Sequence, residues 1–577
     1  MARFLSKTLA CLGALAALFM SPSWALGQTS PALPPPSSLS QTSRSQSAVP
    51  TPQELNPASA APKQAHKNDI FIAPEPGPCP LRDSSLTFVL KKVEFVGADG
   101  VKASKLLPSY DGLIGQRVPV WTVCDIRDRA TAALFAAGIL ARVEIPSQRI
   151  ADGQLQLEVI EARIVSIHFH GDAGPAEAKV EDYLEHLRGL IPFDLNIAQR
   201  YLLLASEVPG VQISAAIRPS PQGRGAVDLE VTATRKMLDA AVNVQNLGSR
   251  TLGPWGGLAR VDFNGLTPFG DRTSMVLYST PDGREQQVAQ LMEEFRPGDS
   301  GLVARASLSY SLTKPGGDLA PEKLDGDAID AQFSLAYPLI RKQRENLSLV
   351  GGFEYVNEQT DLASTTVLFD DRLRILFAQI QTDARGTLWG RPWAVGGDLE
   401  LRKGLNILNA SPLGESTLSI TGANPNAFVQ RLAGHATLDP APWIELYGAA
   451  TAQNADSSLL TYEELAIGNL TYGRGYDPSS VAGDRGVAGT AELRVGPFTP
   501  APRLVVQGYV FFDAAYAKRI GVSPLGSTVR STGGGLRFSY DSRFNLDIAY
   551  ADPLDRINNL AARPPPARAL VTMSASY

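Results

Sequence analysis

Apolar and polar residues alternate along this chain in two different rhythms, and the rhythm changes near residue 237. Before that point, short alternating segments flank stretches in which apolar residues recur with the 3.6-residue period of a helix that buries one face. In the stretch 123–140 these positions are Val123, Ile126, Ala130, Ala133, Leu134 and Ala137. After residue 237 only the alternation recurs, and it is typical of strands.

The first rhythm occurs twice, in two units of about 75 residues each. The first unit contains, in order, a strand at 86–97, a helix at 123–140 and strands at 141–150 and 153–164. The second contains a strand at 163–171, helices at 176–187 and 196–208, and strands at 211–220 and 226–235. We therefore expect two tandem β-α-α-β-β domains of the α+β class, at residues 81–163 and 164–236.

Residues 237–577 form short alternating segments separated by Gly, Asn, Asp and Pro turns. The last segment places Ala569, Val571, Met573, Ala575 and Tyr577 on one face, and Arg568, Thr572, Ser574 and Ser576 on the other. An apolar outer face, a polar inner face and an aromatic rim residue, here Tyr577, are typical of an outer-membrane barrel strand. At roughly 20 residues per strand and connection the stretch holds roughly 16–18 strands. We expect a transmembrane antiparallel β-barrel of about 16 strands; a soluble β-sandwich is the alternative.

The first 25 residues predict export from the cytoplasm. Arg3 and Lys7 precede the apolar run "LACLGALAALFM", and small residues around Ala25 supply a cleavage site. The run is too short to span a hydrocarbon core of about 30 Å as a helix. We therefore expect a signal peptide at residues 1–25, followed by a Pro- and Ser-rich linker at residues 26–80.

Cysteines and charge refine this assignment. Cys11 leaves with the signal peptide, so Cys79 and Cys124 remain, and an even pair in an exported protein favours a disulfide. Two separate thiols are the alternative. A bond between them would stabilise the first domain by about 3–4 kcal/mol. The balance of 53 basic and 58 acidic residues gives no support for nucleic-acid binding.

The sequence contains no recognisable catalytic, cofactor or metal constellation. His168 and His170 share one strand face without a third ligand, so we interpret them as ordinary strand residues. Neither a Gly-rich phosphate loop nor a G-x-S-x-G elbow occurs. We therefore expect no enzymatic activity, no cofactor and no metal.

Several stretches carry a resemblance to a known family. "DGQLQLEVIEARI" and "PFDLNIAQRYLLLASEVPGVQISAAIRP" are similar to the end of the first and to the second of two tandem POTRA domains. "LAYPLIRKQRENL", "TYGRGYDPSSVAGDRGVAGTAELR" and "VFFDAAY" are similar to a barrel strand, an extracellular loop with an R-G-Y core and a strand motif F-x-D-x-G. From residue 78 to residue 577 the chain thus resembles the outer-membrane transporters of two-partner secretion, the haemolysin secretion/activation family of the Omp85 superfamily.

The resemblance implies a function and partners. The POTRA domains would capture an unfolded exoprotein of haemagglutinin, haemolysin or adhesin type in the periplasm, and the barrel would export it without nucleotide hydrolysis. The barrel would lie in the outer membrane of a Gram-negative bacterium, in contact with lipid and inserted by the barrel assembly machinery. The alternatives are an outer-membrane assembly factor of the same superfamily and a passive porin, which lacks tandem periplasmic domains.

The resemblance also implies a pair of residues in the lumen. In the family, the loop after the eleventh strand folds back into the barrel and its arginine pairs with an aspartate of a nearby strand; here these are Arg474 and Asp513. Alternation along the strand independently turns Asp513 toward the lumen. The rest of the two motifs consists of Gly473, Gly475 and Tyr476 in the loop and of Phe511 and Ala515 in the strand, where Ala515 replaces the family's glycine.

Overall fold

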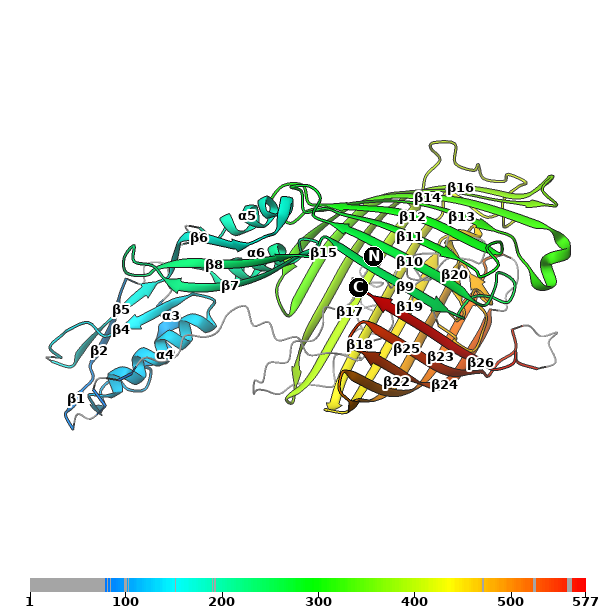
Figure 1. The fold of residues 1–577 in the computed structure, drawn as a ribbon. Helices are drawn as coiled ribbons and strands as arrows, with labels where there is room; N and C mark the ends of the chain where they lie inside the picture. The colour runs from blue at the N-terminus through cyan, green and yellow to red at the C-terminus, as the bar shows by residue number, and fades with distance from the viewer. Residues whose placement is uncertain are drawn as a thin grey trace.

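The computed structural model describes residues 78–79, 81–82, 85–97, 101, 103–150, 152–188, 190, 193–469, 472–521, 526–557 and 563–577. The expected signal peptide and nearly all of the expected linker lie outside the described residues. Figure 1 shows a barrel and an arm of helices and small sheets that extends from one end of it. Among the described helices, none has the length and the apolar character that a bilayer crossing requires.

The first unit of the arm packs a helix on a three-stranded sheet. Its elements are β1 (Thr87–Val89), β2 (Lys92–Val96), α3 (Ala103–Leu106), the 3-10 helix η2 (Leu107–Ser109), β3 (Arg117–Pro119), α4 (Thr122–Ala136), β4 (Ala141–Glu144) and β5 (Gln154–Glu161). The sheet has the order β2-β5-β4, with β2 parallel and β4 antiparallel to β5. The predicted face of α4 packs on it through Val123, Ile126, Ala130 and Leu134.

Two strands of this unit are shorter than the alternation predicts. The expected strand 86–97 divides into β1 and β2, because its hydrogen-bond partner changes. β1 pairs with β3, whereas the N–H groups of Lys91 and Lys92 donate to the carbonyl of Gly153. The expected strand 141–150 ends at Glu144, two residues before Pro146. A proline has no N–H to donate to a strand ladder, so the pairing stops there.

The second unit has the expected β-α-α-β-β order. Its elements are β6 (Arg163–Gly171), the 3-10 helix η3 (Gly174–Ala176), α5 (Glu177–Glu185), α6 (Leu195–Ser206), β7 (Val211–Pro219) and β8 (Ala226–Arg235). The sheet order is β6-β8-β7, with β6 parallel to β8. Asp194 caps α6, because its carboxylate accepts from the N–H of Asn196 at 2.7 Å and from that of Ile197 at 3.4 Å.

The remaining strands close into an antiparallel barrel of 16 strands, in agreement with the expected number. They are β9 (Leu238–Gln245), β10 (Gly256–Asn264), β11 (Arg272–Ser279), β12 (Gln286–Phe295), β13 (Val303–Thr313), β14 (Leu324–Arg341), β15 (Glu345–Leu362), β16 (Thr366–Leu388), β17 (Arg391–Gly404), β18 (Phe428–Ala441), β19 (Ile444–Ala455), β22 (Arg485–Ala501), β23 (Leu504–Lys518), β24 (Ser527–Tyr540), β25 (Phe544–Pro553) and β26 (Arg568–Ser576). The short elements η4 (Gly317–Glu322), η5 (Thr461–Glu463), β20 (Leu465–Ile467) and β21 (Val481–Gly483) lie in connections. β26 pairs with β9 and completes the ring.

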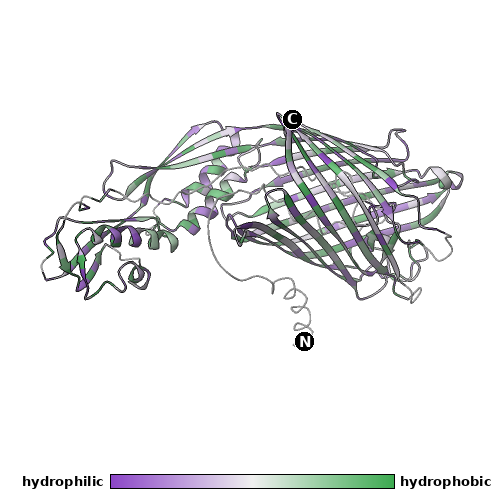
Figure 2. Ribbon diagram, turned by 90° about the horizontal axis from the view of Figure 1, so that it is seen from below, coloured by the Kyte–Doolittle hydropathy of each residue, from purple (hydrophilic) through white to green (hydrophobic). Residues whose placement is uncertain are grey.

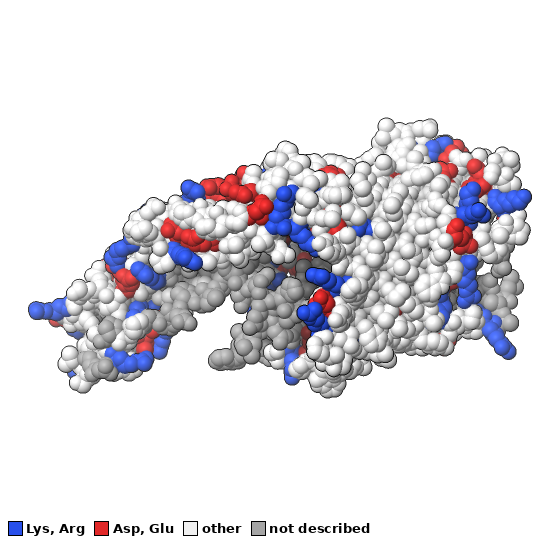
Figure 3. Space-filling view, viewed as in Figure 1, with Lys and Arg blue, Asp and Glu red and all other residues white. Residues whose placement is uncertain are grey.

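The barrel wall is apolar outside and polar inside, as the alternation predicts. On β23 the side chains of Val510 and Phe512 are 56% and 46% exposed, whereas Phe511 and Asp513 are buried. Hydrophilic and hydrophobic residues alternate along the barrel strands in Figure 2. In Figure 3 the charged side chains of the barrel gather toward its two ends, and the wall between them is largely uncharged. Tyr577 is exposed at the rim next to the arm.

The second unit of the arm is fastened to the near end of the barrel by basic side chains. Arg200 on α6 donates to the carbonyl of Pro338 at 2.8 Å. Arg296, in the turn after β12, donates to the carbonyl of Glu207 at 2.9 Å, and the Glu207 carboxylate bonds to Arg341 at the end of β14. These contacts fix the second unit to the near end of the barrel.

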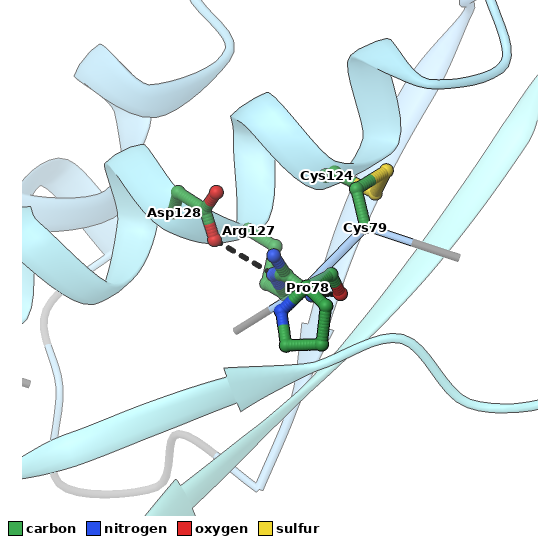
Figure 4. The surroundings of a disulfide bond; sticks show 5 residues. All are labelled: Pro78, Cys79, Cys124, Arg127 and Asp128. Atoms are coloured by element: carbon green, nitrogen blue, oxygen red, sulfur yellow. Dashed lines mark hydrogen bonds and ion pairs between the residues drawn. A yellow bond between two sulfur atoms is a disulfide. The ribbon is translucent and has the colours of Figure 1, made fainter. Parts of the chain in front are cut away.

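A disulfide joins Cys79 to Cys124 across a sequence separation of 45 residues. Figure 4 shows it at the first turn of α4, beside Arg127, which donates to the Pro78 carbonyl at 3.3 Å and to Asp128 at 2.7 Å. The bond therefore fixes the start of the described chain to the helix that covers the first sheet.

Substitution Cys124→Ser is expected to lower the free energy of unfolding of the first unit by about 3–4 kcal/mol, because the unfolded segment regains the entropy that the closed loop removes. Pulse proteolysis of the full-length protein in increasing urea measures this loss. Cys79→Ser is the matched control, since either change removes the same bond. A loss with Cys124→Ser but not with Cys79→Ser would contradict the entropic explanation.

Candidate functional site

The connection between β19 and β22, residues 456–484, folds back into the barrel, and we call it the lumen loop. β19 is the eleventh barrel strand, so this is the loop that the resemblance singles out. Within it β20 and β21 pair as a short antiparallel ribbon. Leu465, Ile467 and Tyr476 are buried and pack in one apolar cluster with Ala515 of β23. The loop is thus seated against the inner wall.

Arg474 and Asp513 meet near the tip of this loop. The Arg474 Nε and Nη2 atoms donate to the two carboxylate oxygens of Asp513 at 3.1 and 2.7 Å. The backbone N–H groups of Gly473 and Arg474 donate to Asp513 Oδ2 at 3.3 and 2.9 Å, and the Ser531 hydroxyl donates to it at 3.1 Å. One wall carboxylate therefore binds both the side chain and the backbone of the loop.

A second carboxylate and an aromatic ring complete the surroundings of Arg474. Its Nη1 atom donates to Glu492 at 2.6 Å and its Nη2 atom to Thr490 at 2.6 Å, both on β22. The guanidinium lies 3.5 Å from the ring centroid of Phe511, a favourable cation–π position. We call Arg474 with Asp513 and Glu492 the tip anchor.

The tip anchor belongs to a larger charged layer of the lumen. Glu492 also accepts from Arg494 at 2.7 Å and from Arg537 at 3.3 Å. Burial disfavours the charge on Arg474, but Asp513 and Glu492 outweigh that effect and hold the pKa of Arg474 above its ordinary value. The arginine stays protonated at any pH that a cell meets, so proton loss does not release the loop.

The structure explains why the loop motif has two glycines and a tyrosine at these positions. Gly473 has a φ of +97°, which favours glycine. A Cβ on Gly475 would lie 2.7 Å from the backbone nitrogen of Pro553, so only glycine allows this approach to β25. Tyr476 is fully buried, and its hydroxyl accepts from the N–H of Asp555 at 2.8 Å.

Sequence reasoning did not identify Thr490, Glu492 or Ser531 as part of this site. Thr490 and Glu492 face the lumen from β22, whose alternation was not singled out as a strand. The signal was present, because Thr490, Glu492 and Arg494 form a polar face at period two. Ser531 contributes one hydroxyl, which no sequence pattern distinguishes.

The described residues contain no group of His, Cys, Asp and Glu side chains that is arranged to hold a metal ion. His168 and His170 both lie on β6. His170 contacts Glu230 of the neighbouring strand at 2.6 Å.

Comparison with known proteins agrees with this architecture. Residues 223–537 match the family model of the haemolysin secretion/activation protein ShlB/FhaC/HecB, and residues 88–162 match the ShlB-type POTRA domain. No curated protein matches the chain.

Among solved structures, CdiB from Escherichia coli is 15% identical, with a TM-score of 0.71 over 91% of this chain and 95% of that chain. CdiB from Acinetobacter baumannii is 16% identical, with a TM-score of 0.61 over 86% and 91%. BamA from Haemophilus ducreyi lacking POTRA domains 1–3 is 12% identical, with a TM-score of 0.51 over 85% and 100%. At these identities the likeness shows the fold.

The family model covers more than half of the 577 residues, and its match contains the barrel strands β9–β23, most of β24 and the loop folded into the barrel. The protein is an outer-membrane translocator of two-partner secretion in a Gram-negative bacterium, with its POTRA region in the periplasm, where a secreted exoprotein binds. The chain belongs to the haemolysin secretion/activation protein family ShlB/FhaC/HecB.

Proposed function

We propose that this translocator exports an elongated exoprotein of haemagglutinin, haemolysin or adhesin type. In this proposal residues 1–25 are the signal peptide, residues 26–80 the linker, residues 81–163 and 164–236 two POTRA domains, and residues 237–577 the barrel. The second POTRA domain captures the exoprotein as an extended strand, and the tip anchor keeps the conduit in its working shape during export. Folding outside the cell gives direction, because a folded exoprotein cannot return through the barrel. The outer-membrane barrel assembly machinery inserts the protein.

The free edge of β7 supports the proposed capture. β7 is an edge strand nine residues long, whereas β4, an edge of the other sheet, has four residues. Its middle residues Ser214, Ala215 and Ala216 include neither a proline nor a charged residue, the kinds that block pairing at a sheet edge. Main-chain hydrogen bonds to such an edge accept many sequences, which suits capture of an unfolded chain.

The other long edge strand of this unit, β6, is partly covered. Its Ile164 forms an isolated parallel bridge with Arg188, in the segment after α5. An incoming strand would have to displace that bridge, so we favour β7 over β6.

The observation that carries the proposed role of the loop is the bidentate ion pair between Arg474 and Asp513. An arginine from an extracellular connection reaches a fully buried carboxylate inside the barrel, and two loop N–H groups bind the same oxygen. Bidentate contacts of this kind fix orientation as well as distance. They support a loop with one defined seat on the wall of the conduit.

A proline scan of β7 tests the proposed capture. Successive N–H groups of a strand point to opposite edges of the strand. One of the two substitutions Ala215→Pro and Ala216→Pro therefore removes a hydrogen bond to β8, and the other removes only an N–H group at the free edge. We expect the variant that retains a folded second unit, as judged by limited proteolysis, to reduce the exoprotein in the medium about tenfold or more, the effect of losing one or two main-chain bonds. Gln222→Pro, in the exposed turn after β7, is the matched control. Normal export from the folded edge variant would refute capture on β7.

A further inference from the structure

A second buried ion cluster holds the lumen loop at Glu463, ahead of the tip anchor in the chain. The Glu463 carboxylate accepts from Arg402 Nε and Nη2 at 3.1 and 2.7 Å and from Arg431 Nη2 at 3.3 Å. The Glu463 carbonyl accepts from Arg431 at 3.2 Å and from Gln453 at 2.9 Å. Glu354 accepts from the same Arg402 at 2.6 Å. The wall thus binds the side chain and the backbone of one loop residue.

The residues next to Glu463 reinforce this attachment. The Tyr462 hydroxyl donates to Asp330 at 2.9 Å and also contacts Glu354. Leu460 packs in an apolar cluster with Leu373 and Ile375 of β16. We call Tyr462 and Glu463, with Arg402 and Arg431, the root anchor.

The two anchors lie on different parts of the barrel wall. The root anchor is bound by β14, β15, β17, β18 and β19, and the tip anchor by β22, β23 and β24. In the strand order of the closed barrel the two sets of strands are neighbours, because β19 of the first set pairs with β22 of the second. The lumen loop, which contains the β20 labelled in Figure 1, is therefore attached to the wall at two places along its length.

The two anchors differ in solvent exposure. The side chains of Arg402 and Glu463 are 5% and 7% exposed, whereas Arg474 is 17% exposed. Separating a buried charge from its partners costs more than separating one that water reaches. The charged side chain that the loop itself contributes is therefore better shielded from water at the root, by Glu463, than at the tip, by Arg474, although the wall carboxylates of the tip, Asp513 and Glu492, are 1% and 4% exposed.

We propose that Glu463 is the pivot of the lumen loop: it stays bound to Arg402 and Arg431 while the tip around Arg474 leaves the wall. The inference rests on the proposed role of the tip anchor and adds a positioning residue to it. Opening then swings the tip about a fixed root, and the loop returns to the same seat after export.

Single reporter cysteines in the full-length protein test the pivot. Thr461→Cys reports on the root and Ser480→Cys on the tip, and the native disulfide leaves no competing thiol on Cys79 or Cys124. In membrane vesicles, Glu463→Gln should raise the rate of maleimide labelling at position 461 about tenfold, the factor expected for loss of one hydrogen bond to a charged group. Arg474→Ala should raise labelling at position 480 roughly a hundredfold, because it leaves the buried Asp513 carboxylate without its guanidinium partner, and should leave position 461 protected.

Three outcomes decide the matter. Protection of position 461 in the Glu463→Gln background overturns the inference, as does equal exposure of both positions by Arg474→Ala, since the loop would then leave as one body. If Arg474→Ala exposes neither position, the tip anchor is refuted instead. The labelling of the Glu463→Gln variant still decides whether Glu463 holds the root.

Controls separate these effects from misfolding. Glu345→Gln removes an exposed acid at the start of β15, at the arm end of the barrel, and should change neither labelling rate. A mobility shift between boiled and unboiled samples verifies that each barrel is closed. Should Glu463→Gln fail that test, Tyr462→Phe replaces it: we expect roughly fivefold faster labelling at position 461 from the lost hydroxyl bonds, and no change overturns the inference.

Discussion

A chain that lacks residues 86–235 is expected to insert its barrel and to export no exoprotein. The closed ladder runs through β9–β19 and β22–β26, so the barrel keeps its strand pairs when the arm is removed. The proposed capture edge, β7, is lost with the deletion. The exoprotein in the culture medium, measured by immunoblotting, should fall to the background of cells without the translocator.

Two features of the structure shape the control for this deletion. Removal of Cys124 leaves Cys79 unpaired, so the deletion should carry Cys79→Ser. Arg296 and Arg341 lose their contacts with Glu207 but keep partners on the barrel, at Glu294 and Asn346. Heat-dependent gel mobility should therefore match that of the full-length barrel. Export at the normal level from this closed barrel would show that capture does not reside in the arm.

Arg474→Ala is expected to reduce secretion about tenfold or more while the amount of closed barrel stays near normal. The change leaves the buried Asp513 carboxylate without its guanidinium partner, and orphaning one member of such a pair costs about 3–5 kcal/mol. Asp513 keeps the Ser531 hydroxyl as a hydrogen-bond donor, so we expect a free-energy cost near the lower end of this range. A loss of about 3 kcal/mol shifts the equilibrium between the seated and released tip by roughly a hundredfold. Immunoblots of medium and of outer membranes measure both quantities.

Three companion variants sharpen this prediction. Arg474→Lys should restore secretion in part, because an ammonium group lacks the bidentate fork. Arg494→Ala is the matched control, since it removes a partly buried arginine from the same Glu492 carboxylate but from the wall strand β22 instead of the loop. Asp513→Ala should reproduce the defect of Arg474→Ala. If it secretes normally while Arg474→Ala does not, the two residues do not act as partners.

Alternation along the sequence predicted a strand best where one face of the strand is apolar and the other is polar along its whole length. The expected strands 163–171 and 226–235 coincide with β6 and β8. β16 was not recognised, because its lumen face carries Leu373 and Ile375, which pack against apolar parts of inward-folded loops. An apolar residue on the polar face erases the period-two signal.

The candidate site was predictable to the extent that it repeats a family motif. Arg474 and Asp513 came from the resemblance, and the alternation of β23 supported Asp513 independently. Glu492 and Glu463 required the structure, because their contacts join distant segments and depend on strand register. The alternation of β22 places Glu492 on the polar face, but the residues that lie beside it depend on the pairing of β22 with β23, and the sequence does not reveal that register.

The disulfide at the start of the described chain has a mechanical consequence. Tension applied to the segment that precedes Cys79 passes through the sulfur atoms into α4. The load therefore bypasses β1 and β3, which pair through three residues each and would otherwise peel apart first. It reaches the helix that is packed on the β2-β5-β4 sheet, so a pull from this end is resisted by the core of the first unit.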